Sequence, residues 1–292
     1  MPTRTPRTRH SGYPGIARLR PRSMLFTLYG DYAYPRGVDL WLGSLVALGA
    51  RFHISEVAVR SAVARLSRDG WLVARRESNR SYYALTERGR ALIEEGTRRI
   101  YRQGRGVWNH QWCLLTYAIP ETHRARRDGL RKQLAWLGFG ALGGGTYISP
   151  HAVAEQTEGL AREHDVTKFA RIFEARFNGP VTPMELVRRC WDLESIARYY
   201  DSFIKHYEPM YARDAMLQRR RSLSDADAFV HRFALTHDFR RFPFIDPELP
   251  VELLPRTWSG SRARELFESY HRLLSDGALA YFKSAAAAAR AA

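Results

Sequence analysis

The sequence predicts a mixed α+β protein of several domains, and three observations support this fold class. Residues 23–85 contain three helix-like segments followed by two β-favouring runs. Residues 105–180 alternate between β-favouring and helical segments. From residue 181 onward, apolar side chains recur at helical spacing. The 292 residues have room for two or three domains of roughly 100–200 residues each.

Start and stop signals divide residues 23–70 into three helices. Ser23 caps a short apolar run that ends at Gly30. A second helix begins at Trp41, where apolar residues take up helical spacing. Ser55 opens a third helix, and Gly70 closes it.

Two β-favouring runs, 71–76 and 81–85, flank a polar turn and predict a β-hairpin. A basic helix then runs from Thr86 to about Tyr101. Three helices followed by a hairpin are typical of the winged helix-turn-helix. We therefore expect residues 23–104 to form a DNA-binding domain.

The third helix has two distinct faces on a helical wheel. Val59, Ala62, Val63 and Leu66 fall on one side and predict a core face, while the opposite side carries small residues flanked by arginines. Such a face suits a major groove about 12 Å wide, although an ordinary solvated helix surface is the alternative. The predicted DNA contacts are Ser55, Val57, Arg60, Ser61, Arg65 and Arg68 on the helix and Arg75, Arg76, Asn79 and Arg80 on the hairpin.

Residues 105–180 predict a small α+β domain. β-favouring runs cover 112–119, 146–149 and 166–177, and helical patterns cover 122–137 and 151–163. The glycines in 138–145 are expected to close the first of these helices and form a turn. The resulting β-α-β-α-β order favours a ferredoxin-like sandwich.

Residues 181–292 predict a helical C-terminal domain. A long helix from Met184 to about Arg221 is expected to kink or break at Pro209. Further helices cover 226–237 and 262–283, with an extended, proline-rich stretch between them. Apolar residues between 186 and 207 form a stripe that belongs either to a dimer interface or to the core of one chain.

Charge and composition narrow the function. The net charge is +16, residues 1–110 carry +12 of it, and this concentration is typical of proteins that bind a polyanion. Residues 1–22 hold six arginines and no acid, which predicts a disordered basic arm that either follows DNA or is a solvated tail.

Composition also excludes several classes of protein. No apolar run approaches the ~18 residues of a membrane span, and the start of the chain lacks a secretory apolar stretch. Two cysteines, Cys113 and Cys190, and no histidine cluster at zinc spacing predict neither a disulfide scaffold nor a metal site. We expect a cytoplasmic protein that is not an enzyme and has no cofactor.

Many short segments resemble the PaaX family of phenylacetic-acid degradation repressors, in the family's order, from residue 23 to about 280. In the DNA-binding part they are 23–32, 41–45, 54–62, 75–77 and 81–83. Further along they are 137–143, 190–193, 237–244, 246–250 and 253–255. The resemblance implies a dimeric repressor with a winged-helix head, a ferredoxin-like middle similar to the Cas2 fold, and a helical C-terminal part.

The family resemblance also implies an effector. Aryl-CoA thioesters, phenylacetyl-CoA in the best-known members, release such repressors from DNA. We accordingly expect a homodimer on a palindromic operator and a pocket with arginine at its mouth and aromatic walls. The candidate effector contacts are Tyr147, Arg171, Arg176, His237, Arg240 and Arg241, and the alternative is that these residues hold the domains together.

Two rival functions remain at this point. One is a sequence-independent, architectural DNA-binding protein. The other is a Cas2-like nuclease, which needs carboxylates near a strand end to hold a metal ion. Residues 112–119 contain no Asp or Glu, and Glu121 is a lone carboxylate, which disfavours the nuclease.

Overall fold

The computed structural model describes residues 19–101 and 107–291, with side chains up to residue 287. The predicted basic arm therefore lies almost wholly outside the described residues. The chain forms two compact units. Of the described residues, unit 1 contains 19–101, 203–240 and 262–291, and unit 2 contains 107–202 and 241–261. The residues of the predicted C-terminal domain, 181–292, are divided between the two units.

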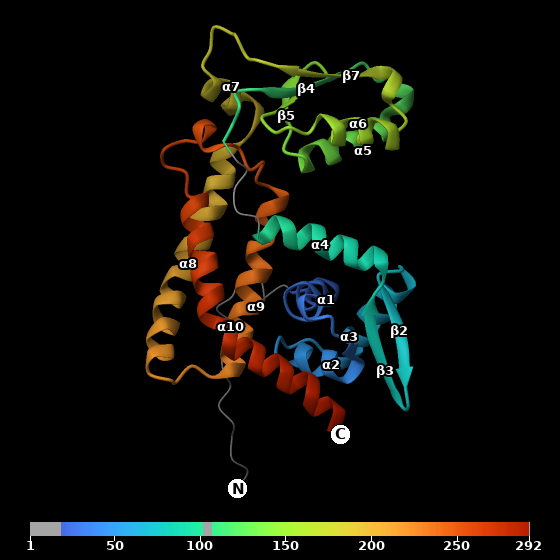
Figure 1. Ribbon diagram of the computed structural model, residues 1–292, viewed down its shortest axis with the longest axis vertical. Helices are drawn as coiled ribbons and strands as arrows, with labels where there is room; N and C mark the ends of the chain where they lie inside the picture. The colour runs from blue at the N-terminus through green and yellow to red at the C-terminus, as the bar shows by residue number, and fades with distance from the viewer. Residues whose placement is uncertain (1–18, 102–106, 292) are drawn as a thin grey trace. The chain divides into compact units, whose positions relative to one another are not determined.

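Unit 1 begins with the predicted series of helices and a hairpin (Figure 1). The helices are α1 (Pro21–Leu28), α2 (Leu42–Ala50), α3 (Glu56–Arg68) and α4 (Glu87–Tyr101). The strands are β1 (Leu40–Trp41), β2 (Leu72–Glu77) and β3 (Arg80–Leu85). They form an antiparallel sheet in the order β1-β3-β2, in which β1 extends the predicted hairpin.

The start of α1 differs from the expectation. The helix begins at Pro21 rather than after Ser23, because proline is well suited to the first helical turn. Gly30 does not end it, since the chain continues through a π-helical turn from Tyr29 to Ala33. This turn buries Asp31, a charged residue with no place in an apolar core unless it is paired.

Most partners of Asp31 come from the C-terminal helices of unit 1. These are α9 (Asp225–Phe239) and α10 (Gly260–Ala291). Arg232 on α9 donates a hydrogen bond to the Asp31 carboxylate at 2.9 Å, and His271 on α10 lies 3.2 Å from it. The hydroxyl groups of Tyr101 and Thr236 also donate to it, at 2.9 and 3.2 Å. The first helices of the chain and its last ones are therefore joined by a buried polar network.

Unit 2 contains a four-stranded antiparallel sheet. Its strands are β4 (Trp112–Tyr117), β5 (Gly140–Gly143), β6 (Thr146–Ser149) and β7 (Ala170–Ala175), in the order β5-β6-β4-β7. Helices α5 (Arg124–Trp136) and α6 (Ala154–Glu163) cover one face of the sheet (Figure 1). The core between the sheet and these helices includes Cys113, Leu115, Leu130 and Leu134.

The predicted strand count in this unit was too low. Gly138 closes α5 with a positive φ of 84°, as expected, but residues 140–143 pair with β6 instead of forming a turn. The observed order is β-α-β-β-α-β, the element order of the ferredoxin-like motif. The last strand is also shorter than expected, because residues 167–169 form a 3₁₀ turn.

The long C-terminal helix breaks at a different place from the one predicted. Residues Trp191 and Asp192 separate α7 (Pro183–Cys190) from α8 (Leu193–Arg219), whereas α8 continues through Pro209. The apolar stripe is buried within the single chain, for example at Leu186, Ile196 and Tyr207. This burial assigns the stripe to the core of one chain rather than to a dimer interface.

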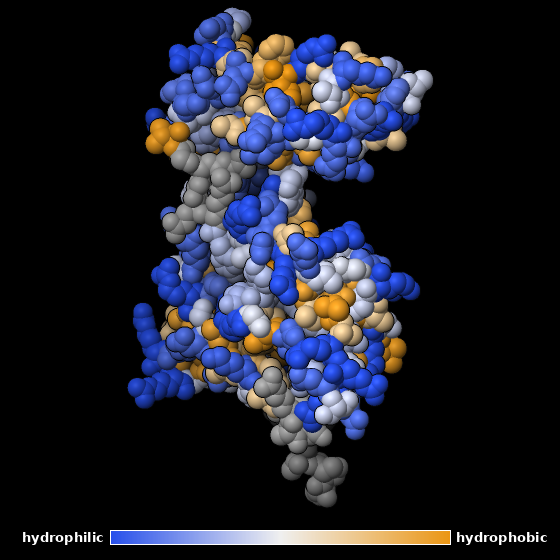
Figure 2. Space-filling view, turned by 45° about the vertical axis from the view of Figure 1, so that its right-hand side comes forward, coloured by the Kyte–Doolittle hydropathy of each residue, from blue (hydrophilic) through white to orange (hydrophobic). Residues whose placement is uncertain are grey.

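The described residues show neither a membrane-crossing helix nor a metal-binding cluster. None of their helices is both long and apolar enough to span a bilayer. In the same residues, no three side chains of His, Cys, Asp or Glu gather where they would hold a metal ion. On the face drawn in Figure 2, hydrophilic side chains predominate and apolar side chains form separate small groups.

Candidate DNA-binding surface and ligand pocket

Helix α3 has one buried face and one open face, as its sequence predicts. Val59, Ala62, Val63 and Leu66 are the buried residues of the helix. All six predicted contacts on this element are exposed, and Val57 leaves 74% of its surface open, which is unusual for an aliphatic side chain. The open face therefore contains small side chains that leave room for a partner to approach the helix.

Local capping fixes where α3 begins. The hydroxyl of Ser55 accepts a hydrogen bond from the backbone N–H of Ala58, as an N-cap residue does. The preceding turn is anchored by Phe52, which is buried and lies 4.1 Å, between ring centroids, from Phe233 on α9. The short connection between α2 and α3 is thus packed against a C-terminal helix of the same unit.

The basic residues on α3 differ in their availability. Arg60 is paired with Glu56 one turn earlier, at 2.7 Å. Arg65 and Arg68 pair with no carboxylate in the described part of the chain. Because an unpaired surface guanidinium keeps its donors for a partner, Arg65 and Arg68 are the arginines of α3 best placed to contact an anion.

The hairpin arginines Arg75 and Arg76 point to opposite faces of β2. They pair in register with Tyr82 and Ser81, and successive residues of a strand alternate between its faces. Arg75 is also paired with Asp39 and Glu77. Only Arg76 is exposed without a carboxylate partner in the described residues, so the two arginines do not serve one surface together.

The hairpin turn is shorter than predicted. Glu77 pairs with Arg80, so that the turn consists of Ser78 and Asn79 alone. Asn79 is exposed at the tip. The guanidinium of Arg80 lies over the ring of Trp41, 4.9 Å from its centroid, which leaves it less free than Asn79.

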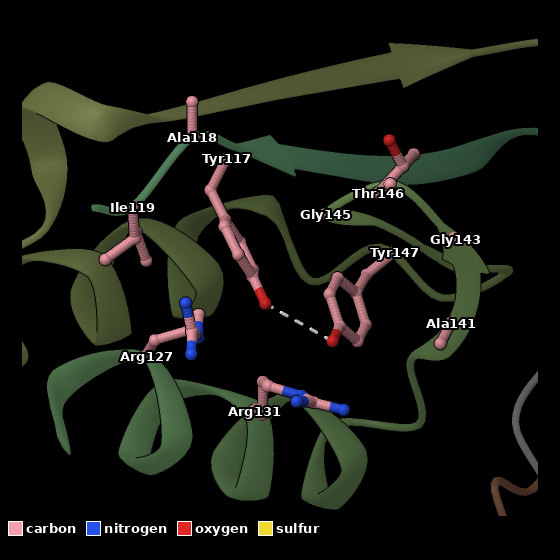
Figure 3. A pocket seen from close by; sticks show the side chains of 11 residues that line it. Tyr117, Ala118, Ile119, Arg127, Arg131, Ala141, Gly143, Gly145, Thr146 and Tyr147 are labelled. Carbon is pink, nitrogen blue, oxygen red and sulfur yellow. Dashed lines mark hydrogen bonds between the residues drawn. The ribbon is translucent and has the colours of Figure 1, made fainter. Parts of the chain in front are cut away.

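Of the six predicted effector residues, Tyr147 lines a cavity. The cavity has a volume of about 460 Å³ and lies between the sheet of unit 2 and α5 (Figure 3). The rings of Tyr147 and Tyr117 are stacked 5.7 Å apart at 21°, and their hydroxyl oxygens lie 3.3 Å apart. Arg127 and Arg131 line the same cavity from α5.

Arg171 and Arg176 do not join Tyr147. Arg171 pairs in register with Thr116, whereas Tyr147 pairs with Leu115, so Arg171 and Tyr147 lie on opposite faces of the sheet. The guanidinium of Arg171 donates to the backbone carbonyls of Lys168 and Ala170. Arg176 is exposed and follows the end of β7.

His237 and Arg240 belong to unit 1, where both contact α1. The Nδ1 of His237 lies 3.1 Å from the hydroxyl of Thr27, and Arg240 donates to the hydroxyl of Ser23. Burial lowers the pKa of Arg240 to about 10. These contacts give His237 and Arg240 a structural place between α9 and α1, while Arg241 is exposed and belongs to unit 2.

Comparison with known proteins establishes the family. Three family models match consecutive parts of the chain: a PaaX-like protein model at residues 20–89, the PaaX protein central Cas2-like domain at 105–187, and the PaaX-like protein C-terminal domain at 191–284. The transcriptional repressor PaaX of Escherichia coli is 33% identical over 89% of this chain and 82% of its own length. The chain belongs to the PaaX family.

A solved structure agrees with this membership at the level of the fold. The uncharacterized protein Rv0674 from Mycobacterium tuberculosis covers 90% of this chain and 98% of its own, with a TM-score of 0.59 and 23% identity. In this PaaX-family chain, the sequence resemblance and the predicted Cas2-like middle domain are therefore confirmed.

Sequence reasoning identified Tyr147 but missed the other residues of the cavity, including Tyr117, Arg127 and Arg131. Tyr117 was predicted to lie on a strand but was not linked to Tyr147, because strand pairing is not visible in a single sequence. The four-residue spacing of Arg127 and Arg131 was the available signal, since it places both on one side of α5.

Proposed function

We propose that the protein is a transcriptional repressor that binds DNA through a winged helix-turn-helix made of α1–α3 and the β2–β3 hairpin. The observation that carries this proposal is the open face of α3, opposite a fully buried face and beside an exposed basic hairpin. Small side chains let the helix enter the major groove, and Arg65 is in position to donate to a base edge. The relative named as a transcriptional repressor supports the same function.

The proposed target is a palindromic operator in a phenylacetate-type catabolic operon. A homodimer would present two α3 helices, and its half-sites would lie about one helical turn apart or a multiple of it. An aryl-CoA thioester such as phenylacetyl-CoA would release the protein by binding better to a dimer geometry that no longer fits this spacing.

The test is a DNA-binding titration of the full chain on its own upstream region at fixed ionic strength, because phosphate contacts make affinity depend on salt. Arg65→Ala should weaken operator binding by roughly tenfold to a hundredfold and relax the preference at one base position. Arg76→Ala should weaken binding to operator and random DNA alike and lower the salt slope by about one. Arg162→Ala on α6 is the matched control, because it removes an exposed arginine outside this surface.

Footprinting and a nuclease assay separate the rival functions. A footprint with a defined protected palindrome excludes a sequence-independent DNA-binding protein. Product formation from DNA or RNA with Mn²⁺ would instead favour a nuclease. Operator binding that is unchanged in a protein carrying Arg60→Ala, Ser61→Ala and Arg65→Ala together would overturn the role of α3. In a titration with added effector, phenylacetyl-CoA should release the protein from the operator. Phenylacetate and free CoA are tested for comparison.

A further inference from the structure

The cavity beside α5 has the donors of an anion site. Figure 3 shows the side chains of Tyr117 and Tyr147 pointing toward each other and toward α5, where Arg127 and Arg131 lie one turn apart. Two guanidinium groups and two phenol groups thus face one space. Guanidinium groups only donate hydrogen bonds, and a phenol donates while it is protonated, so the groups match the oxygens of a phosphate.

The two arginines divide the charge of this wall unequally. Arg127 is half-buried and donates to Glu121 at 2.9 Å, which holds the guanidinium in place and offsets its charge. Arg131 is exposed to the cavity and pairs with no carboxylate in the described residues. The unbalanced positive charge of the cavity therefore comes from Arg131.

Tyr117 is available as a hydrogen-bond donor at neutral pH. Burial, together with the hydrogen bond to Tyr147, raises the pKa of Tyr117 well above its usual value. The Tyr117 phenol therefore stays protonated and can donate a hydrogen bond. The stacked rings also give a flat surface next to these donors.

The rim of the cavity is bare backbone. Gly143, Gly144 and Gly145 all have positive φ, between 56° and 105°, a conformation that residues with a side chain seldom adopt. A Cβ atom at Gly143 or Gly144 would meet no atom within 4 Å, so the space outside this loop is open. A ligand can approach the backbone here without meeting a side chain.

A second cavity, of about 540 Å³, meets the first at Arg131, Ala141 and Tyr147. Its wall includes Ala135 and Phe139 next to the charged side chains of Asp128 and Lys132. Arg131 and Tyr147 thus stand between the space next to Arg127 and the glycine loop and a second space whose wall is partly apolar and partly charged. A ligand with an anionic group in the first cavity can therefore place an apolar group against Ala135 and Phe139 in the second.

We propose that the paired cavities beside α5 bind a small phosphorylated ligand with an apolar end, whose phosphate lies between Arg131, Arg127 and the Tyr117–Tyr147 hydroxyl groups. The apolar end extends past Tyr147 toward Phe139. This site rests on the proposed function for the identity of its natural ligand, because an aryl-CoA thioester carries both parts. It replaces the dispersed set of arginines that the sequence suggested with one site in unit 2.

The experiment measures ligand binding and DNA release separately in the full chain. Equilibrium dialysis with phenylacetyl-CoA, CoA and inorganic pyrophosphate reports the site itself. Operator titrations with and without phenylacetyl-CoA report the effector response. Arg131→Ala should weaken binding of phenylacetyl-CoA by roughly tenfold or more, the loss of one charge-assisted hydrogen bond, and leave operator affinity without ligand unchanged.

Two further variants distinguish the contacts. Tyr147→Phe keeps the ring and removes the hydroxyl, so it should weaken CoA and pyrophosphate binding a few-fold. Phe139→Ala should weaken the binding of phenylacetyl-CoA and leave the binding of pyrophosphate unchanged. Arg162→Ala removes an exposed arginine from the neighbouring helix α6. This control variant should bind every ligand as the unaltered protein does. Circular dichroism checks that each variant is folded.

The outcomes separate the site from the function. If the variants lose the ligand but phenylacetyl-CoA never releases DNA from the unaltered protein, the site stands and the effector role fails. If phenylacetyl-CoA releases the Arg131→Ala and Tyr147→Phe variants from operator DNA as readily as it releases the unaltered protein, the site is wrong and the repressor function stands. If the unaltered protein binds neither CoA, its thioester nor pyrophosphate, the site is overturned outright.

Discussion

Arg232 in unit 1 and Arg131 in unit 2 are both helical arginines, yet their surroundings give them opposite uses. Only 6% of the Arg232 side chain is exposed, and it contacts Asp31 at 2.9 Å and His271 at 2.9 Å. Arg131 is exposed on a cavity wall with no carboxylate partner in the described chain. A buried, paired guanidinium stabilises the fold, whereas an open, unpaired one keeps its donors for a ligand.

The same contrast holds within α3. Val59, Ala62, Val63 and Leu66 are buried in unit 1, while the side chains of Ser61 and Arg65 on the other face make no hydrogen bond or ion pair with the described part of the chain. Stability and binding therefore depend on different residues of one helix. Substitutions that affect one property and spare the other test this division.

The largest expected effect is that of Asp31→Asn. It leaves the buried Arg232 without its counter-charge, which costs about 3–5 kcal/mol of the free energy of unfolding. Urea unfolding followed by tryptophan fluorescence measures the change. Arg131→Gln should stay within about 0.5 kcal/mol of the unaltered protein, and equal losses from both substitutions would contradict the comparison.

Leu66→Ala is expected to come next. Removing a buried leucine side chain costs about 3 kcal/mol through lost burial and the cavity that remains. Ser61→Ala, on the open face, should change stability by less than about 0.5 kcal/mol. DNA binding of both variants is measured at a temperature where both are folded. Ser61→Ala should weaken operator binding under these conditions.

The charge network predicts a loss of stability in acid. Burial acts to raise the pKa of Asp31, but the hydrogen bond of His271 and the charges of Arg232 and His271 outweigh it and lower the pKa to about 2. A lowered carboxyl pKa stabilises the fold above its unfolded value of 3.8 and loses this contribution as pH falls toward 2.

The measurement is a difference between two proteins. Between pH 5 and pH 2, the advantage of the unaltered protein over Asp31→Asn in urea unfolding should shrink by about 2 kcal/mol. Other carboxyls that titrate in both proteins cancel in this difference. An advantage that stays constant over this range would show that Asp31 is not held ionised by the network.

Ser55→Ala is expected to cause a small loss of stability. The hydroxyl of Ser55 makes one exposed cap hydrogen bond to the N–H of Ala58, so its loss should cost about 1 kcal/mol. Ser55→Asp keeps an acceptor and should restore most of the stability. If Ser55→Ala weakened operator binding more than tenfold while it stayed folded, Ser55 would be a DNA contact as well as a cap.

Local signals were enough to predict several parts of the fold. The faces of α3, its Ser55 cap and the β2–β3 hairpin follow from helical spacing, capping chemistry and β-favouring runs, and the structure has each of them. Local signals failed where a neighbour decides. Residues 140–143 read as a glycine turn, and only pairing with β6 makes them a strand.

Which distant residues share a site depends on the packing of one element against another. Asp31 and Arg232 lie 201 positions apart, and the sequence around either residue does not predict their contact. The cavity joins Tyr117, Tyr147 and Arg131 from two strands and a helix. Periodicity predicts which way a side chain faces on its own element. The groups that it contacts depend on packing between elements, and the energy of that packing cannot be predicted from one segment.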